Sequence, residues 1–193
     1  MNITLSKPSK LPCQSYSLPA TACKVGSKLR KIPGSVCSKC YACKGNYVRF
    51  PKIQESLERR LEAISDPQWV PTMIDLIKKA TKKTKYFRWH DSGDIQSVEH
   101  FVKIIEIAKE LPDVMFWLPT KEVEIIYGFM DIPSNLIIRV SSPMIDGTPP
   151  DFSHTSTSVT KGEMCPASKQ GGKCVDCRMC WDKDIKNVSY LMH

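Results

Sequence analysis

The chain has 193 residues, of which 41% are hydrophobic and 25% are charged. This composition excludes a largely disordered chain, and the length suits a single domain over residues 1–193. No apolar run approaches the length of a membrane span, and residues 1–8 lack the apolar stretch of a signal peptide. We therefore expect a cytoplasmic protein that makes no contact with a membrane.

The net charge of +8 indicates a basic surface, which attracts nucleic acid and other polyanions. The lysines are spread along the chain, and the sequence contains no RNA-recognition signature and no helix-turn-helix pattern. Nucleic acid is therefore a candidate partner on charge alone. The simpler interpretation is that the lysines keep the protein soluble.

Two helices are predicted after a loop-rich segment. Residues 1–50 are rich in proline, serine, glycine and cysteine, a composition that favours loops. From Pro51 to Ile64, apolar side chains recur at helical spacing. The pair at 66–67, Asp-Pro, marks the start of a second helix, which ends in the lysines of 78–83.

Strands and helices then alternate. The expected elements are a strand at 86–89, a helix capped by Ser97 that ends before Pro112, a strand at 114–118, a helix at 121–130 and a strand at 136–140. This alternation implies parallel strands joined by helical crossovers. Three such units are too few for a closed eight-stranded barrel. We expect an α/β core over 51–145 that forms a partial (incomplete) βα barrel or a small open parallel sheet, followed by loops from 146 to 172.

Nine cysteines flank this core, within the segments 1–50 and 146–193, and each flank contains the run C-x2-C-x2-C. In a reducing cytoplasm these cysteines indicate metal ligands rather than disulfides, and an odd number cannot all pair. The N-terminal cysteines are Cys13, Cys23, Cys37, Cys40 and Cys43, and the C-terminal ones are Cys165, Cys174, Cys177 and Cys180.

The four C-terminal cysteines form a complete ligand set within one short segment. Three thiolates in one run, with a fourth nearby, favour a [4Fe–4S] cluster. Zinc bound by four cysteines is the alternative, although zinc sites more often use two separated C-x2-C pairs. Trp181, which directly follows Cys180, is expected to shield the cluster from water and so to contribute to cofactor binding.

The N-terminal cysteines allow three arrangements, so one or two clusters are expected. In the preferred arrangement, Cys13, Cys23, Cys37 and Cys40 hold a second cluster and Cys43 is left over, because this gives each end four ligands. In the second arrangement, the run from Cys37 to Cys43 holds three corners and leaves one iron open to substrate. In the third, cysteines from both ends share one centre.

Polar side chains gather where the strand at 86–89 ends. In parallel α/β folds, functional groups lie beyond the carboxyl ends of the strands. We expect a substrate pocket there, with the catalytic candidates Arg88, His90, Asp91, Asp94 and Lys121. The alternatives are a helix-capping turn for the aspartates and structural ion pairs for Arg88 and Arg139.

Two further histidines carry no prediction of a role. We expect His100 and His154 on the surface, as ordinary solvated side chains rather than metal ligands.

Several longer motifs resemble a known family. They are Pro12-Cys13-Gln-Ser-Tyr-Ser-Leu-Pro19, the segment 33–42, Phe87-Arg-Trp-His-Asp-Ser-Gly-Asp94, Phe116-Trp-Leu-Pro-Thr120 and the ending from Gly172 to Trp181. On these motifs, nearly the whole chain resembles the gene product 88 family of bacteriophage proteins, which has no established activity. The resemblance implies a phage or prophage gene whose product acts in the cytoplasm of the host cell.

The chain is also remotely similar to radical S-adenosylmethionine enzymes, because cysteines precede a βα core. It lacks the C-x3-C-x2-C motif of those enzymes and a glycine-rich motif for the methionine group. S-adenosylmethionine is therefore implied by this resemblance alone and by no motif of the chain.

Three functions follow as hypotheses. The first is an iron–sulfur protein that performs redox or radical-type chemistry on a small-molecule or macromolecular substrate. The second is a zinc-bound, basic module that binds nucleic acid. The third is a non-enzymatic interaction protein whose metal centre holds its loops in place.

Overall fold

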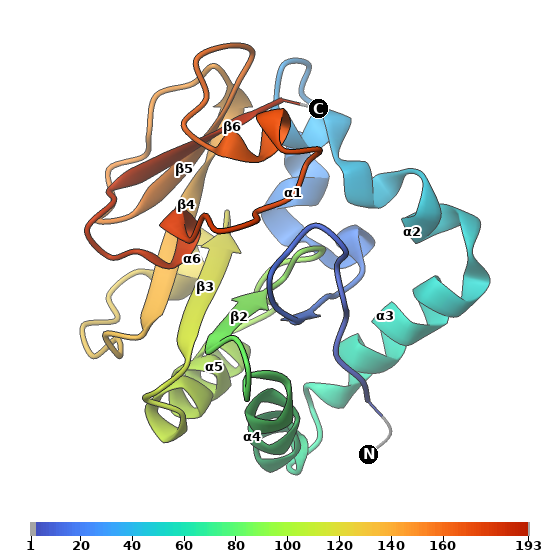
Figure 1. The fold of residues 1–193 in the computed structure, drawn as a ribbon. Helices are drawn as coiled ribbons and strands as arrows, with labels where there is room; N and C mark the ends of the chain where they lie inside the picture. Colours follow the sequence, from blue (N-terminus) through green and yellow to red (C-terminus); the bar gives the residue numbers. More distant parts are fainter. Residues whose placement is uncertain (1–2, 193) are drawn as a thin grey trace.

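One six-stranded parallel sheet organises the computed structural model, which describes residues 3–192 (Figure 1). Its strands are β1 (Ser15–Tyr16), β2 (Tyr86–Trp89), β3 (Met115–Thr120), β4 (Leu136–Ile145), β5 (Thr155–Val159) and β6 (Asn187–Leu191). They lie side by side in the order in which they occur in the chain, and every pair is parallel. This confirms the expected α/β class and the open parallel sheet.

Six α-helices accompany the sheet in residues 3–192: α1 (Lys24–Leu29), α2 (Asn46–Arg49), α3 (Pro51–Ala63), α4 (Trp69–Ala80), α5 (Val98–Glu110) and α6 (Val123–Ile126). The predicted cap of α5 is present, because the Ser97 hydroxyl accepts a hydrogen bond from the backbone N–H of His100 at 3.2 Å. The predicted helix at 121–130 is shorter than expected. Gly128, with φ of 83°, lies just beyond its end.

Three strands, β1, β5 and β6, lie outside the strands predicted from the sequence. β1 is two residues long, and β5 and β6 are rich in serine, threonine and asparagine. β5 pairs with β4 on one side and with β6 on the other. Backbone hydrogen bonds to neighbouring strands stabilise these segments. Their sequences lack a regular alternation of apolar residues, so the pattern of apolar residues does not predict them as strands.

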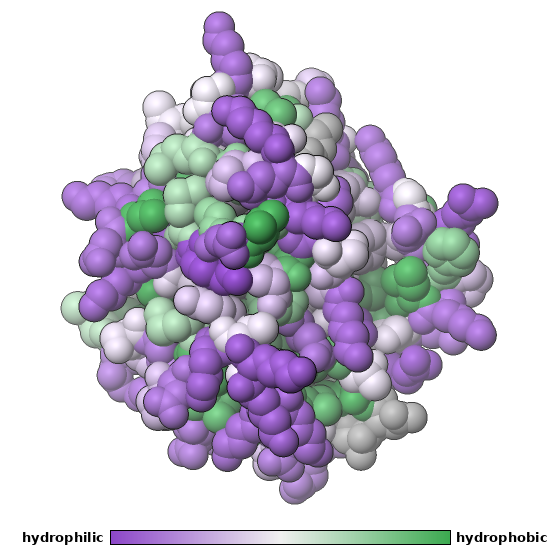
Figure 2. Space-filling model, in the orientation of Figure 1, coloured by the Kyte–Doolittle hydropathy of each residue, from purple (hydrophilic) through white to green (hydrophobic). Residues whose placement is uncertain are grey.

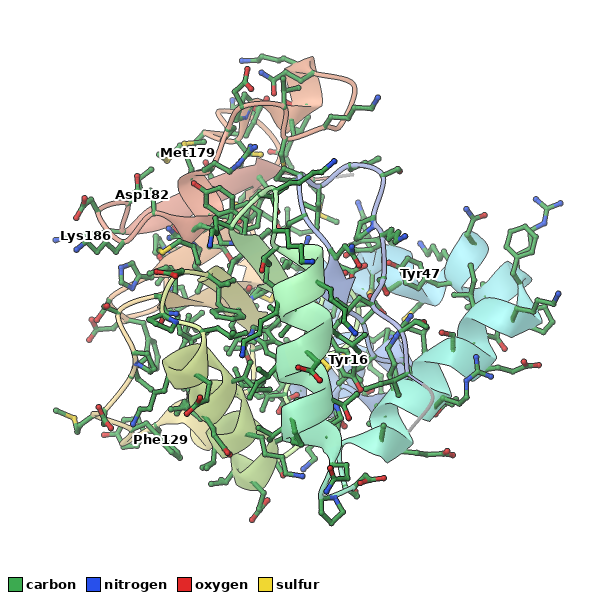
Figure 3. All side chains as sticks on the ribbon, turned by 60° about the horizontal axis from the view of Figure 1, so that its bottom comes forward. Tyr16, Tyr47, Phe129, Met179, Asp182 and Lys186 are labelled. Atoms are coloured by element: carbon green, nitrogen blue, oxygen red, sulfur yellow. The ribbon has the colours of Figure 1, made fainter. Side chains whose placement is uncertain are left out.

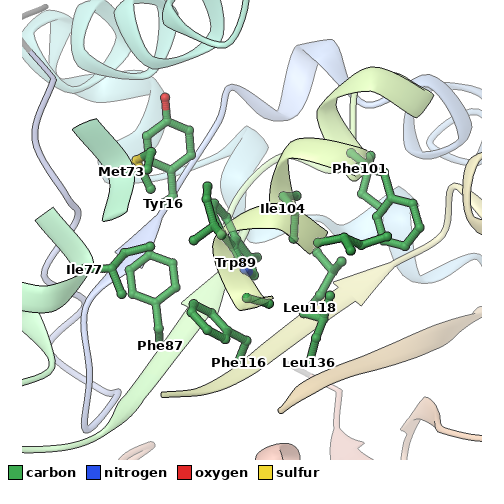
Figure 4. Packing of buried hydrophobic residues seen from close by; sticks show 14 of the residues in the cluster. Tyr16, Met73, Ile77, Phe87, Trp89, Phe101, Ile104, Phe116, Leu118 and Leu136 are labelled. Atoms are coloured by element: carbon green, nitrogen blue, oxygen red, sulfur yellow. The ribbon is translucent and has the colours of Figure 1, made fainter. Parts of the chain in front are cut away.

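The main core lies between the sheet and α4 and α5. Figure 4 shows Phe87 and Trp89 of β2 and Phe116 of β3 in one buried cluster with Met73 and Ile77 of α4. All five side chains have no exposed surface. This apolar core fixes the carboxyl ends of β2 and β3, where polar residues follow.

A second, smaller cluster of buried side chains involves the strands and the C-terminal segment. Trp117 of β3, Val188 of β6 and Trp181 pack with the thiols of Cys13 and Cys180. Trp117 alternates with Phe116 along β3, so the two side chains point to opposite faces of the sheet. The C-terminal segment, drawn in orange to red in Figure 1, passes across the strands on this second face.

No helix in residues 3–192 combines the length and the apolar composition that crossing a membrane requires.

Candidate functional site

All nine cysteines are free thiols, and they lie in two groups. We call Cys23, Cys37, Cys40 and Cys43 the edge group. The Sγ atoms of Cys23 and Cys37 both lie beside Gly26 of α1, where an added Cβ would be 3.7 and 3.6 Å from them. Burial is the largest cause of the raised pKa of Cys43, and the charge of the neighbouring Cys40 is the next. The four thiols therefore lie near one another.

The edge group lies at the carboxyl ends of β2 and β3. Burial raises the pKa of Cys23, and the charge of Asp94 raises it further. Asp94 itself accepts hydrogen bonds from the Thr120 hydroxyl at 2.6 Å and from the Lys121 N–H at 2.9 Å. Burial raises the pKa of this carboxyl to about 6, against the effect of those hydrogen bonds. Asp94 thus ties the turn after β2 to the end of β3.

Lys121 and Glu122 connect the same edge to the cysteine loops. Burial raises the pKa of Cys37, and the Lys121 ammonium partly offsets this effect, so its charge lies close to the thiol. The Glu122 carboxylate accepts a hydrogen bond from the backbone N–H of Val25 at 2.8 Å, which holds the start of α1 against the sheet. Glu122 has no distinctive motif, and only its position directly after a strand could have suggested this role.

The face group consists of Cys13, Cys165, Cys174, Cys177 and Cys180, and lies on the second face of the sheet. Burial raises the pKa of Cys174 most, followed by the charges of Cys165 and Cys177. Burial raises the pKa of Cys13 to about 12, and the charge of Cys174 adds to the rise. The Cys180 thiol lies 3.2 Å from the Tyr190 hydroxyl of β6. The sheet therefore brings a cysteine of the N-terminal loop to the four C-terminal ones.

This grouping differs from the arrangement preferred on sequence. Cys13 lies with the C-terminal cysteines, and Cys43, expected to be left over, lies with Cys23, Cys37 and Cys40. The preferred arrangement assumed that each end of the chain supplies four cysteine ligands to its own cluster. The short strand β1 decides otherwise, because it carries the loop with Cys13 to the second face and leads on to Cys23 beyond the carboxyl edge.

The thiols are near one another but not tightly clustered. Among residues 3–192, no three cysteine, histidine, aspartate or glutamate side chains form a set that could hold one metal ion. Burial raises the pKa of Cys180 to about 12, so its thiol is neutral at physiological pH. Binding of any metal centre has to displace that proton, since the thiolate is the ligand.

Arg139 of β4 holds the C-terminal segment on the second face. Its side chain is fully buried, and its guanidinium donates hydrogen bonds at 2.7 to 2.9 Å to the carbonyl oxygens of Met179, Cys180, Asp182 and Ile185. Figure 3 labels Met179 and Asp182 on this segment. The structural role expected for Arg139 is present, but backbone carbonyls rather than a carboxylate satisfy the charge.

Arg88 of β2 lies on the same face, but its guanidinium makes different contacts from that of Arg139. Its guanidinium stacks over Trp117, with the central carbon 4.2 Å from the ring centroid. Its Nε is shielded from solvent and has no hydrogen-bond partner. Within residues 3–192, the one ion pair is between Lys109 and Asp131, so Arg88 has no carboxylate at contact distance. Burial lowers the pKa of Arg88, but the nearby Tyr41 and Asp91 outweigh that effect and raise it. The positive charge of Arg88 instead lowers the pKa of Cys13, Cys174 and Cys180, against the larger effect of burial.

Asp91 anchors the loop that carries the edge group. Its carboxylate accepts hydrogen bonds from the hydroxyl of Ser17, from that of Ser15 at 2.5 Å and from that of Tyr47 at 2.8 Å. Its backbone carbonyl accepts one from the Tyr41 hydroxyl. Figure 3 labels Tyr47, which belongs to α2. With its oxygens occupied by three donors, Asp91 serves as a structural tie between β1, β2 and α2.

His90 turns away from this site. Its φ of 49° is left-handed, and its ring packs against His100 of α5, with 5.4 Å between the ring centroids. Both rings are buried, so the expectation that His100 is a surface residue is wrong. Burial lowers the pKa of His90 well below its usual value and that of His100 to about 3, so both are neutral. His154, by contrast, is partly exposed and contacts the Lys183 carbonyl through Nε2 at 2.8 Å.

The five residues expected to line one pocket thus occupy three places. Asp94 and Lys121 lie beside the edge group, Arg88 lies beside the face group with Asp91 between the two, and His90 faces α5. Trp181 is buried next to Cys180, and its indole N–H donates a hydrogen bond to the Phe87 carbonyl at 2.9 Å. This position suits the shielding role predicted for it.

Comparisons with known proteins identify a family and no closer relative. No curated protein and no solved structure matches the chain. The family model described as Gene product 88 matches residues 2–165. The match includes the edge group, Arg88, Asp91 and Asp94 and ends at Cys165, so the last three cysteines lie beyond it. On this match over most of its length, the chain belongs to the gene product 88 family.

Proposed function

We propose that this protein binds iron–sulfur clusters through its two cysteine groups and uses them for one-electron chemistry. The observation that carries the proposal is the gathering of free thiols from both ends of the chain around Arg88, a partly buried cation whose Nε is shielded and which forms no ion pair at contact distance in residues 3–192. A buried charge is costly unless something compensates it. A cluster with thiolate ligands is anionic and supplies that compensation.

The C-x2-C-x2-C run within each thiol group supports a cluster over a single zinc ion. Four thiolates, each about 2.3 Å from a zinc ion, have to lie within about 4 Å of one another. No set of side chains in the described chain is that compact, although the thiols of each group still influence one another's pKa. An iron–sulfur cluster holds its ligands on separate iron atoms and so requires wider spacing.

We assign the ligands by group. Cys165, Cys174, Cys177 and Cys180 would hold one cluster, with Trp181 and Tyr190 excluding water from it. Cys23, Cys37, Cys40 and Cys43 would hold the other, next to Asp94 and Lys121 at the carboxyl edge of the sheet. The clusters supply the electron transfer. The residues of the chain provide shielding, positive charge and a polar edge at which a substrate can bind.

Metal analysis of protein purified without oxygen tests this proposal. We expect a brown protein that contains iron and acid-labile sulfide, with an electron paramagnetic resonance signal after reduction. A colourless protein with stoichiometric zinc would contradict the proposal and favour a zinc module. Calorimetric titration with S-adenosylmethionine tests the remote resemblance separately, because the proposed clusters do not depend on it.

A further inference from the structure

A hollow of about 460 Å³ lies beside the face group, between the N-terminal loop and the end of α4. Lys7, Lys79, Lys82 and Lys83 line it, and all four are exposed. Its remaining lining includes Pro8, Leu11, Pro12 and Ala80, and it contains no acidic residue. The hollow therefore combines apolar residues with exposed lysines, which suits an acidic partner.

The wall of this hollow separates solvent from the face group at two points. Cys13, itself a member of the face group, lines the hollow directly. Lys10, in the same loop, accepts a hydrogen bond through its carbonyl from the backbone N–H of Cys174 at 3.0 Å. Gln14, which also lines the hollow, accepts a hydrogen bond through its backbone carbonyl from the backbone N–H of Arg88 at 3.3 Å. A molecule seated in the hollow is thus beside Cys13 and is separated from Cys174 by the loop that carries Lys10.

We propose that this hollow is the docking surface for an acidic one-electron carrier protein that reduces the face-group cluster, an inference that rests on the proposed function. The reduced carrier gives up one electron and the cluster accepts it, with no bond formed or broken. Lysines act as point charges that steer an acidic partner into a short-lived complex. Electron-transfer complexes are of this small and transient kind.

The lining favours an acidic protein over nucleic acid. It contains no arginine, whose guanidinium binds phosphate through bidentate hydrogen bonds, and no aromatic ring on which a base can stack. Hydrophilic side chains cover much of the face seen in Figure 2. The net charge of +8 therefore does not distinguish this surface from the rest of the molecule. Its proximity to Cys13 and Cys174 distinguishes it.

Charge reversal in the hollow tests the inference. The variant Lys79→Glu/Lys82→Glu/Lys83→Glu is compared with Lys52→Glu/Lys161→Glu/Lys183→Glu, which changes the net charge equally at exposed positions outside the hollow. The rate of cluster reduction is measured by stopped flow at low ionic strength, with a reduced flavodoxin as the acidic carrier and with dithionite as a small reductant. A milder set, Lys→Gln at the three hollow positions, serves if the reversal impairs folding.

We expect the hollow variant to be reduced by flavodoxin roughly 10-fold more slowly or worse, since steering contributes about 10- to 1,000-fold to association. Its reduction by dithionite and the rates of the control variant should stay unchanged. Equal slowing of both variants, or of neither, overturns the inference while leaving the cluster proposal intact. Loss of binding to random-sequence DNA without slower reduction would assign the hollow to nucleic acid instead. Absence of iron and sulfide from every preparation would reject the underlying function.

Discussion

The two arginines on the second face of the sheet show how differently one residue type is used. The Arg139 guanidinium donates hydrogen bonds to backbone carbonyls and so holds the segment from Met179 to Ile185 in place. Arg88 stacks on Trp117 and keeps an unpartnered Nε beside the face group. We therefore attribute fold stability to the first, and under the proposed function the second would compensate the charge of an anionic cluster.

This difference predicts opposite effects of the same substitution. Arg139→Met should lower the free energy of unfolding of the metal-free protein by at least about 3 kcal/mol, because several buried carbonyls lose their donor. Arg88→Met should change it by less than about 1 kcal/mol, because the substitution removes the stacking on Trp117 but no ion pair at contact distance in residues 3–192. Urea unfolding measures both. If Arg88→Met is as destabilising as Arg139→Met, Arg88 has a structural role.

In protein loaded with iron, the same pair of variants tests whether Arg88 compensates the charge of the proposed cluster or only packs against Trp117. Arg88→Met should lose iron to a chelator faster and should have a lower reduction potential, since a positive charge near the cluster favours its reduced form. Arg88→Lys should restore much of the potential. An unchanged potential in Arg88→Met with full iron content would contradict the compensating role.

At the scale of elements, β2 and α5 are joined by a buried pair of neutral histidines. His90 at the end of β2 and His100 in α5 both have lowered pKa values, caused mainly by burial. The unfolded chain takes up protons on these rings below about pH 6.5, while the folded chain does not. Their contribution to stability is therefore present at neutral pH and is lost as the pH falls from about 6.5 toward 3.

We predict that stability decreases below pH 6.5 by up to roughly 1.4 kcal/mol per pH unit for each histidine. Asp94 acts in the opposite direction between about pH 6 and its usual value of 3.8, because its raised pKa lets the folded state bind a proton first. Two histidines outweigh one aspartate, so the net effect remains a loss. Urea midpoints measured from pH 7.5 to 4.5 give the slope.

The histidine pair can be tested against a matched control. His100→Met should flatten the pH dependence of stability, because it removes one titrating ring from the interface of β2 and α5. His154→Gln, at a partly exposed position, should leave the slope unchanged. An equal slope in wild type and His100→Met would assign the acid sensitivity to other groups.

For the whole molecule, the chain path decides which cysteines meet. β1 places Cys13 on the second face of the sheet, while the loops from Cys23 to Cys43 lie at its carboxyl edge. Cysteines adjacent in sequence thus serve different groups, and cysteines from opposite ends of the chain share one. Neither group is complete until the sheet has formed, so metal binding and folding should be coupled.

Serine substitutions test this division of the thiols. Cys43→Ser should lose about half of the iron, the share of the edge group, and Cys177→Ser should lose the share of the face group. Cys13→Ser, a change of the same kind within the face group, should keep both, because four other thiols remain there. Iron and sulfide assays on protein purified without oxygen give the outcome. Loss of iron from Cys13→Ser equal to that from Cys177→Ser would make Cys13 a ligand.

Local patterns in the sequence were enough for the α/β class, the positions of α3, α5, β2 and β3, and the concentration of thiols at the two ends. These features depend on apolar periodicity, caps and residue type, which act over a few neighbouring residues. The long apolar strands and helices were therefore predictable. The short polar strands β5 and β6 were not, because partners elsewhere in the chain stabilise them.

Tertiary structure alone decided the composition of the site. It separated Arg88 from His90 through one left-handed residue, moved Cys13 to the C-terminal cysteines and placed lysines from two segments around one hollow. Each of these depends on contacts between residues tens of positions apart, whose geometry is set by strand order and packing. Sequence determined which chemical groups this protein has, and the packed sheet determined which of them act together.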